Sequence, residues 1–264
     1  MHFAKYTGCG NDFILIDGRS HPAITTKQIS TLCDRHQGIG ADGVILLERS
    51  QKALLKMTIY NQDGSQAEMC GNGIRCLHHF AGQLHFPSNL QIETPSGIYT
   101  TSETHNGLIA VQMTAPKLGI SSYTIEGITC DATFTGVPHL VCQVENVLMV
   151  DVQKMGRLLR FHPTFKPSGT NVNFVQIESA DRLLVRTYER GVERETLACG
   201  TGAIAAAYVH SQKERKLSGE RTIEVKTRSG ESLITEFFYR DGEVTSLKLI
   251  GPARKVFEGN IVLD

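Results

Sequence analysis

Two cysteines lie in matching motifs in the two halves of this chain. Cys70 begins a Cys-Gly-Asn-Gly run, and Cys199 begins a Cys-Gly-Thr-Gly run. A segment with the composition of a helix follows each run, at 74–83 and at 203–212, and the second is rich in alanine, the strongest helix former. Each cysteine is therefore expected at a helix start, where unpaired backbone N–H groups and the helix dipole favour a thiolate and bind carboxylates.

Two such sites on opposite sides of one small carboxylate could invert an α-carbon. One cysteine, as a thiolate, would remove the α-proton, and the other, as a thiol, would return a proton to the opposite face. Backbone N–H groups at both helix starts would hold the carboxylate and stabilise the charge that develops on it. These groups belong to Gly71, Asn72, Gly200 and Thr201. This chemistry needs no cofactor, and no lysine motif points to pyridoxal phosphate.

Other interpretations of the two cysteines stay open at this point. A single Cys-Gly-x-Gly run is as well explained by a buried structural cysteine before a glycine turn, but two copies favour chemistry. A thiol-disulfide redox protein would be expected to carry a Cys-x-x-Cys motif or a resolving cysteine, and neither is evident. A third possible class is a non-catalytic amino-acid-binding protein. Such a protein has no catalytic rate that a cysteine variant could lower, whereas an enzyme does.

Composition narrows the class of protein. The 264 residues are 41% hydrophobic and 20% charged, with 27 basic and 27 acidic residues, which argues against a nucleic-acid or membrane-surface partner. No apolar run approaches the roughly 20 residues of a membrane span, and the N-terminus starts in a strand pattern rather than a signal peptide, so a cytoplasmic location is expected. Seven cysteines, an odd number, do not suggest a disulfide framework, and no cluster has metal-ligand spacing, so no metal is expected.

The order of motifs in the first half recurs in the second. Gly40–Ile45 corresponds to Gly169–Phe174 at the same separation as the two cysteines, and three further matches follow the same order. The repetition predicts two similar α+β domains, with a boundary near Pro116–Ser122, where Pro, Gly and Ser cluster. The expected domains are 1–117 and 118–254, with a cleft between them that receives one cysteine motif from each.

Six motifs across nearly the whole chain carry a family resemblance. They are Gly8–Phe13, Asn61–Ser65, Cys70–Gly73, Asn171–Phe174, Tyr188–Gly191 and Glu195–Gly202. Together they resemble diaminopimelate epimerase, a cofactor-independent isomerase of lysine and peptidoglycan-precursor synthesis that converts the LL form of its substrate to the meso form. The resemblance implies two domains, each a β-sheet wrapped round a central helix, with segment 255–264 returning to the first. It is also compatible with a homodimer.

The resemblance assigns roles to residues at matching positions. Cys70 and Cys199 would be the acid/base pair, and His139 and Glu189 would tune the catalysis. The residues implied to bind substrate are Asn11, Asn61, Gly71, Asn72, Asn171, Glu189, Arg190, Gly200 and Thr201. An arginine can pair with a carboxylate, a glutamate can accept from an ammonium, and asparagines supply both kinds of group, which suits a zwitterionic substrate end.

Two positions depart from the family pattern. Val137 stands where the family usually has an asparagine that helps bind the distal end of the substrate, and Gly43 stands where some members have glutamine. Both departures concern substrate selectivity rather than the cysteine chemistry. They keep open the alternative of a two-cysteine racemase with relaxed specificity for another amino acid, such as glutamate.

Overall fold

The chain forms two compact units in the computed structural model, which describes residues 1–20, 23–116, 118–213 and 218–263. Unit 1 is Met1–Gln112 together with Gly251–Asp264, and unit 2 is Met113–Ile250. The division falls a few residues before the one expected after residue 117, and the returning segment begins at 251 rather than 255. No helix in the described part of the chain is long and apolar enough to cross a membrane.

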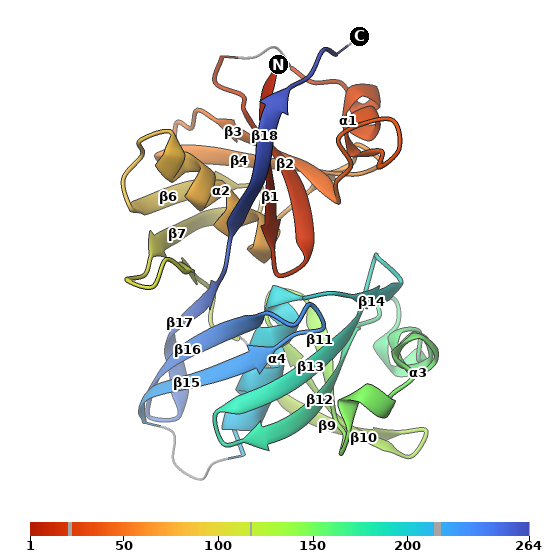
Figure 1. The fold of residues 1–264 in the computed structure, drawn as a ribbon. Coiled ribbons are helices and arrows are strands. Elements are labelled where there is room, and N and C mark those ends of the chain that lie inside the picture. The colour runs from red at the N-terminus through yellow and green to blue at the C-terminus, as the bar shows by residue number, and fades with distance from the viewer. Residues whose placement is uncertain (21–22, 117, 214–217, 264) are drawn as a thin grey trace. The chain divides into compact units, whose positions relative to one another are not determined.

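Unit 1 combines a mixed sheet with α-helices (Figure 1). Its strands are β1 (His2–Gly8), β2 (Asn11–Asp17), β3 (Gly43–Glu48), β4 (Leu55–Asn61), β5 (Gln66–Ala67), β6 (Asn89–Thr94), β7 (Gly97–Glu103), β8 (Ile109–Gln112) and β18 (Arg254–Asn260), and its helices are α1 (Thr26–Cys33) and α2 (Gly71–Gln83). The strand order is β18-β1-β2-β3-β4-β6-β7-β8, and β5 also pairs with β4. The β2–β3 and β4–β6 pairs are parallel, and the other pairs are antiparallel.

Unit 2 is built in the same way. Its strands are β9 (Leu118–Ile125), β10 (Ile128–Phe134), β11 (Pro138–Gln143), β12 (Asn171–Ser179), β13 (Arg182–Glu189), β14 (Arg194–Thr196), β15 (Gly219–Lys226), β16 (Ser232–Arg240) and β17 (Glu243–Gly251). Its helices are α3 (Val152–Arg160) and α4 (Gly200–Ser211), with short 3₁₀ turns at Val147–Met149 and Pro163–Phe165. The strand order is β9-β10-β11-β12-β13-β15-β16-β17, and β14 also pairs with β13.

The two sheets share one topology. The parallel pairs of unit 2 are β11–β12 and β13–β15, at the same places in the order as β2–β3 and β4–β6 in unit 1. Among the described strands the two orders differ at one edge, where unit 1 uses β18 from the end of the chain and unit 2 uses β9 from its own beginning. This repetition confirms the predicted α+β fold of two similar domains.

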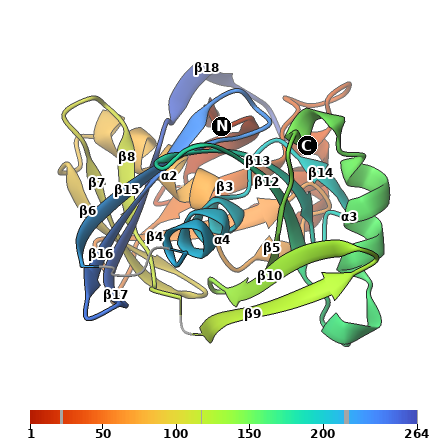
Figure 2. The ribbon, with the colours of Figure 1, turned by 90° about the horizontal axis from the view of Figure 1, so that it is seen from below.

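A central helix organises each unit. Helix α4 contacts β10–β13, β15 and β16, and Figure 2 shows these strands around it. Its buried residues are small or aliphatic on every side, as expected for a helix without a solvent face. Helix α2 contacts β1–β4, β7, β8 and β18 of its own unit. Both helices begin three residues before the predicted positions, immediately after the cysteines.

The segment Pro116–Ser122, near which the domain boundary is expected, overlaps strand β9, because residues 118–122 belong to that strand. Pro, Gly and Ser predict a loop when they are considered locally. Pairing of β9 with β10 along the hairpin overrides that preference, since sheet formation depends on cross-strand partners more than on intrinsic propensity.

Candidate active site

Cys70 caps the central helix of unit 1. Its backbone is extended, and its Sγ accepts a hydrogen bond of 3.4 Å from the backbone N–H of Gly73. The thiol is partly exposed. A side chain at Gly73 would bring its Cβ to 2.9 Å from Ile45 Cδ1, so glycine lets the helix start lie close against strand β3. The motif thus places a partly exposed thiol beside the backbone N–H groups of a helix start.

A directed chain of hydrogen bonds supports this helix start. The Arg75 guanidinium donates to Asn72 Oδ1 at 2.7 Å, Asn72 Nδ2 donates to Asn11 Oδ1 at 2.6 Å, and Asn11 Nδ2 donates to Asp42 Oδ2 at 3.0 Å. Asn72 is only 3% exposed, so its side chain is part of the scaffold. Asn11 keeps one amide hydrogen and one lone pair outside this chain.

Charged groups hold the β1–β2 hairpin on which Asn11 lies. Asp12 forms ion pairs with Lys5 at 2.7 Å and with Arg35 at 2.7 Å. Burial opposes ionisation of Asp12, but the hydrogen bonds from Arg35 and Lys5 outweigh it and lower the pKa of Asp12 to about 2. Cys9, at the turn of the hairpin, has φ +52°. The ion pairs of Asp12 therefore hold the hairpin next to its turn.

Asn61 and Gly43 are register partners on β4 and β3. Asn61 is exposed at the end of its strand, where its Nδ2 donates to Ser65 Oγ at 3.0 Å. At Gly43 a Cβ would lie 2.4 Å from the backbone oxygen of Tyr60. The glutamine that some relatives were expected to carry at this position therefore has no room here without a shift of the backbone.

Cys199 occupies the equivalent position in unit 2, with one difference. It caps α4 with an extended backbone, but its side chain makes no capping bond and its Sγ lies 3.5 Å from Thr201 Oγ1. Glycine is again needed three positions after the cysteine, because a Cβ at Gly202 would lie 2.4 Å from Asn173 Oδ1. Thr135 Oγ1 donates to the carbonyl of Thr201 at 3.0 Å and holds this helix start to the β10–β11 hairpin.

His139 lies on β11 beside this helix. It is 1% exposed, and its Nδ1 is 3.1 Å from Asn173 Nδ2. Burial, assisted by the charge of Arg190, lowers the pKa of His139 to about 3, so the ring is neutral at physiological pH. Its Nε2 has no hydrogen-bond partner among the described residues.

The remaining predicted residues gather where β12 and β13 lie side by side. Asn171 Nδ2 donates to the carbonyl of Pro138 at 3.1 Å, and its Oδ1 accepts from the backbone N–H of Arg190 at 2.8 Å. The Arg190 guanidinium contacts the carbonyl of Ser168 at 3.5 Å and forms no ion pair with the described residues. Burial raises the pKa of Glu189. An arginine with no carboxylate partner and a carboxylate shielded from water are suited to bind complementary charges.

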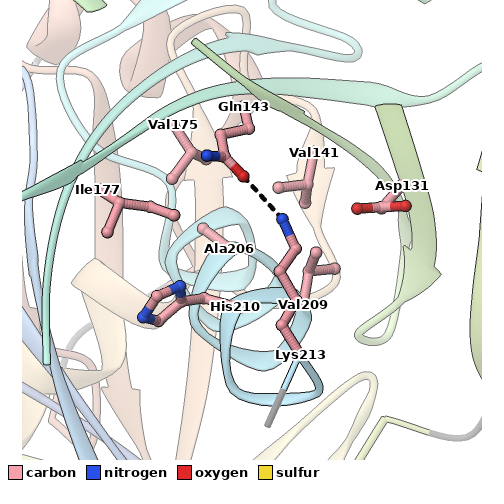
Figure 3. A pocket seen from close by; sticks show the side chains of 9 residues that line it. All are labelled: Asp131, Val141, Gln143, Val175, Ile177, Ala206, Val209, His210 and Lys213. Carbon is pink, nitrogen blue, oxygen red and sulfur yellow. Dashed lines mark hydrogen bonds between the residues drawn. The ribbon is translucent and has the colours of Figure 1, made fainter. Parts of the chain in front are cut away.

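Two small cavities in unit 2 are not substrate sites. One, beside Cys199, has a volume of about 10 Å³ and is lined in part by Thr187, Thr196 and Thr227, so it can hold one water at most. The other lies at the opposite end of α4, where Lys213 donates to Gln143 at 2.7 Å (Figure 3). None of the residues predicted to act in the site lines the second cavity.

Sequence reasoning missed two buried residues of these sites, Arg75 and Asn173. Arg75 is fully buried and also donates to the carbonyls of Gly71 and Pro252, and Asn173 is buried and hydrogen-bonded to His139 and Thr187. A signal for Arg75 was present, since the equivalent position of the second motif is Ile204. A charge in one copy of a buried helix and not in the other indicates a specific role.

The fold matches solved structures of known epimerases and related proteins. A phenazine biosynthesis protein of the PhzF family from Bacillus anthracis aligns with a TM-score of 0.76 and 15% identity, over 100% of this chain and 99% of that chain. A hydroxyproline epimerase from Agrobacterium vitis aligns with a TM-score of 0.69 and 14% identity, over 98% and 91%. At these identities the match defines the fold alone: two similar domains, each with a sheet around a central helix.

The sequence comparisons define the family. The family profile described as diaminopimelate epimerase matches residues 3–119 and 132–256, one segment for each repeat. The diaminopimelate epimerase of Aquifex aeolicus (strain VF5) is 43% identical over 277 aligned positions, which cover 99% of this chain and 98% of that protein. This chain belongs to the diaminopimelate epimerase family, and it is an isomerase.

Proposed function

We propose that this chain interconverts LL- and meso-diaminopimelate by a two-base mechanism in which Cys70 and Cys199 act on opposite faces of one α-carbon. The observation that carries the proposal is that both cysteines cap the central helices of two units with the same topology. Membership of the diaminopimelate epimerase family supports the substrate. The mechanism requires both thiols to reach the same carbon when substrate is bound.

In this mechanism the two sulfur atoms exchange roles with the direction of reaction. One thiolate removes the α-proton, and the other thiol donates a proton to the opposite face, so each turnover inverts the carbon and regenerates the opposite protonation state. The N–H of Gly73 already points at Cys70 Sγ, whereas Cys199 Sγ is close to the hydroxyl of Thr201. We propose that Cys70 is the thiolate in the resting enzyme, because a fixed backbone donor stabilises an anion.

The reacting carboxylate would bind to the backbone at the two helix starts. The first N–H groups of a helix have no partner within the helix, and they carry the positive end of its dipole. Negative charge moves onto the carboxylate as the carbanion forms, so these donors stabilise the transition state more than the bound substrate. The N–H groups are those of Gly71, Asn72, Gly200 and Thr201.

The distal amino-acid end of the substrate would be recognised by Arg190, Glu189 and three asparagines. Arg190 has no carboxylate partner in the described part of the chain and can pair with the distal carboxylate. Asn171 and Asn11 each keep one donor and one acceptor beyond their present bonds, and Asn61 is exposed. His139 and Glu189 would tune the charge around the thiols.

The main alternative is a two-cysteine racemase that accepts glutamate. It rests on Val137, which lacks the carboxamide expected to bind the distal end of diaminopimelate. Arg190 and the asparagines still suit a longer zwitterion, so we propose that diaminopimelate is the preferred substrate. We also propose that the enzyme works in the cytoplasm, in lysine and peptidoglycan-precursor synthesis, as a homodimer.

The function is tested with purified protein, LL-diaminopimelate and no added cofactor, by chiral chromatography of the product. We expect meso-diaminopimelate to form until the two isomers reach equilibrium. Cys70→Ala and Cys199→Ala should each lower the rate by about 10²–10⁴-fold, the usual contribution of a general acid or base. Cys33→Ala, which removes a buried thiol at the end of α1, should keep most of the activity. Inversion by both catalytic variants at the parent rate would contradict the proposal.

A further inference from the structure

The imidazole of His139 is held by one side chain. Its Nδ1 lies 3.1 Å from Asn173 Nδ2, and Asn173 itself is fully buried. The other ring nitrogen, Nε2, is buried and has no hydrogen-bond partner among the described residues. Buried polar atoms of folded proteins are nearly always paired, so an unpaired ring nitrogen in a candidate site needs an explanation.

The orientation of the Asn173 amide is fixed by its other neighbours. Its Nδ2 also lies 3.0 Å from the carbonyl oxygen of Leu140, which can only accept, so this end of the amide must be the donor. Its Oδ1 accepts from Thr187 Oγ1 at 3.0 Å. The reversed amide would place Oδ1 against the Leu140 oxygen, two acceptors facing each other.

The fixed amide determines which ring nitrogen carries the proton. Asn173 uses one amide hydrogen for Leu140 and presents the other to His139 Nδ1, so Nδ1 must accept. In a neutral imidazole the proton is then on Nε2. The ring is neutral because burial, with the charge of Arg190, lowers its pKa to about 3.

We propose that Asn173 is a positioning residue that holds neutral His139 with its proton on Nε2, so that His139 donates a hydrogen bond to an anionic group in the site and does not act as a base. The inference rests on the proposed function. The acceptor is an anionic oxygen or sulfur, either the substrate carboxylate or a catalytic thiolate. In both cases the Nε2–H group, which has no partner among the described residues, would donate a hydrogen bond to that anion.

The first test is the tautomer itself, read from ¹⁵N chemical shifts of the histidine rings. The chain has 10 histidines, and the signal of His139 is the one lost in His139→Gln. We expect protonated Nε2 and unprotonated Nδ1 in the parent protein at pH 7. Protonated Nδ1 would overturn the proposal. This measurement needs neither substrate nor activity, so it remains decisive if the chain does not act on diaminopimelate.

A matched pair of variants separates the positioning role from a packing role. Asn173→Asp keeps the shape of the side chain but replaces the donor to Nδ1 by an acceptor, so the proton should move to Nδ1 or the ring should become charged. Thr187→Val removes the bond to the far side of the same amide and should leave the proton on Nε2. The same tautomer in Asn173→Asp as in the parent would contradict the proposal.

Activity separates a donor from a base. The amide nitrogen of His139→Gln can occupy the place of Nε2 and donate, whereas His139→Leu cannot. We expect His139→Gln to keep at least about tenfold more kcat/KM than His139→Leu, the scale of one hydrogen bond to a charged group. Equal loss in both variants would indicate a base and overturn the donor role, even while the epimerase function itself stands.

The acceptor is identified by the Nε2 signal. A shift on adding diaminopimelate assigns the substrate carboxylate, and a shift between the parent and Cys70→Ala or Cys199→Ala without substrate assigns a thiolate. If the signal moves in neither comparison, His139 does not donate to an anion in this site.

Discussion

Gly43 shows how the position of one atom limits the residues that a site can carry. The backbone oxygen of Tyr60 occupies the space of a Cβ at this position, at 2.4 Å. We expect Gly43→Ala to lower the free energy of unfolding by about 1–3 kcal/mol, the usual range for overpacking. Gly82→Ala is the matched control, since nothing lies within 4 Å of its Cβ and alanine favours a helix, so it should be neutral or stabilising by up to about 1 kcal/mol. Chemical denaturation of both variants compares them, and equal stabilities would show that strand β4 moves away freely.

Val137 is the residue on which substrate selectivity is predicted to depend. It lies half-buried in the loop between β10 and β11, and valine offers no hydrogen bond to a polar substrate. We expect the parent to invert glutamate slowly beside diaminopimelate, and Val137→Asn to raise the preference for diaminopimelate. One hydrogen bond corresponds to about 0.5–1.5 kcal/mol, or roughly a 2- to 10-fold change in the ratio of kcat/KM values. If the parent does not invert glutamate, or if the ratio is unchanged in the variant, Val137 does not relax the substrate selectivity.

Helix α2 differs from α4 by one buried charge, and this difference has a measurable consequence. Arg75 supplies donors to Asn72 and to the carbonyls of Gly71 and Pro252. Arg75→Ile, which copies Ile204 of the second repeat, leaves these acceptors unpaired and should cost about 3 kcal/mol of unfolding free energy. It should also lower kcat/KM, because Asn72 no longer holds Asn11.

The control for that variant is Lys154→Ile on the exposed face of α3, which should change stability by less than about 0.5 kcal/mol. Denaturation and the epimerase assay on both variants provide the comparison. An Arg75→Ile protein as stable and active as the parent would show that the hydrogen-bond chain is dispensable.

The β1–β2 hairpin should make stability depend on pH in acid. The pKa of Asp12 is lowered from 3.8 to about 2, so its ionised form stabilises the fold above the unfolded-state pKa and this contribution is lost as pH falls through about 2. Asp12→Asn should therefore destabilise the protein by about 2 kcal/mol at pH 7, with a difference that narrows between about pH 4 and pH 2. A difference that stays constant over this range would assign the effect to packing rather than charge.

At the scale of the whole molecule, the sequence predicted the duplicated domains and the local structure around the two cysteines. The helix starts followed from Cys-Gly-x-Gly before apolar runs, and the two-domain fold followed from motifs at a common separation. Strand β9 could not be predicted, because its pairing with β10 outweighs its Gly and Ser content. The role of Asn173 could not be predicted, since burial and hydrogen bonds between residues far apart in the chain are not visible in one sequence. For Arg75, only the contrast with Ile204 of the second repeat offered a signal.

The measurement that tests the two-base mechanism most directly is deuterium incorporation during early turnover in heavy water. With a separate cysteine on each face, the abstracted proton is held on one sulfur while the other delivers deuterium from solvent. We therefore expect early label at the α-carbon of the product, with recovered substrate almost unlabelled, in both directions of reaction. Equal early labelling of substrate and product would show that one base serves both faces and would contradict the mechanism proposed for Cys70 and Cys199.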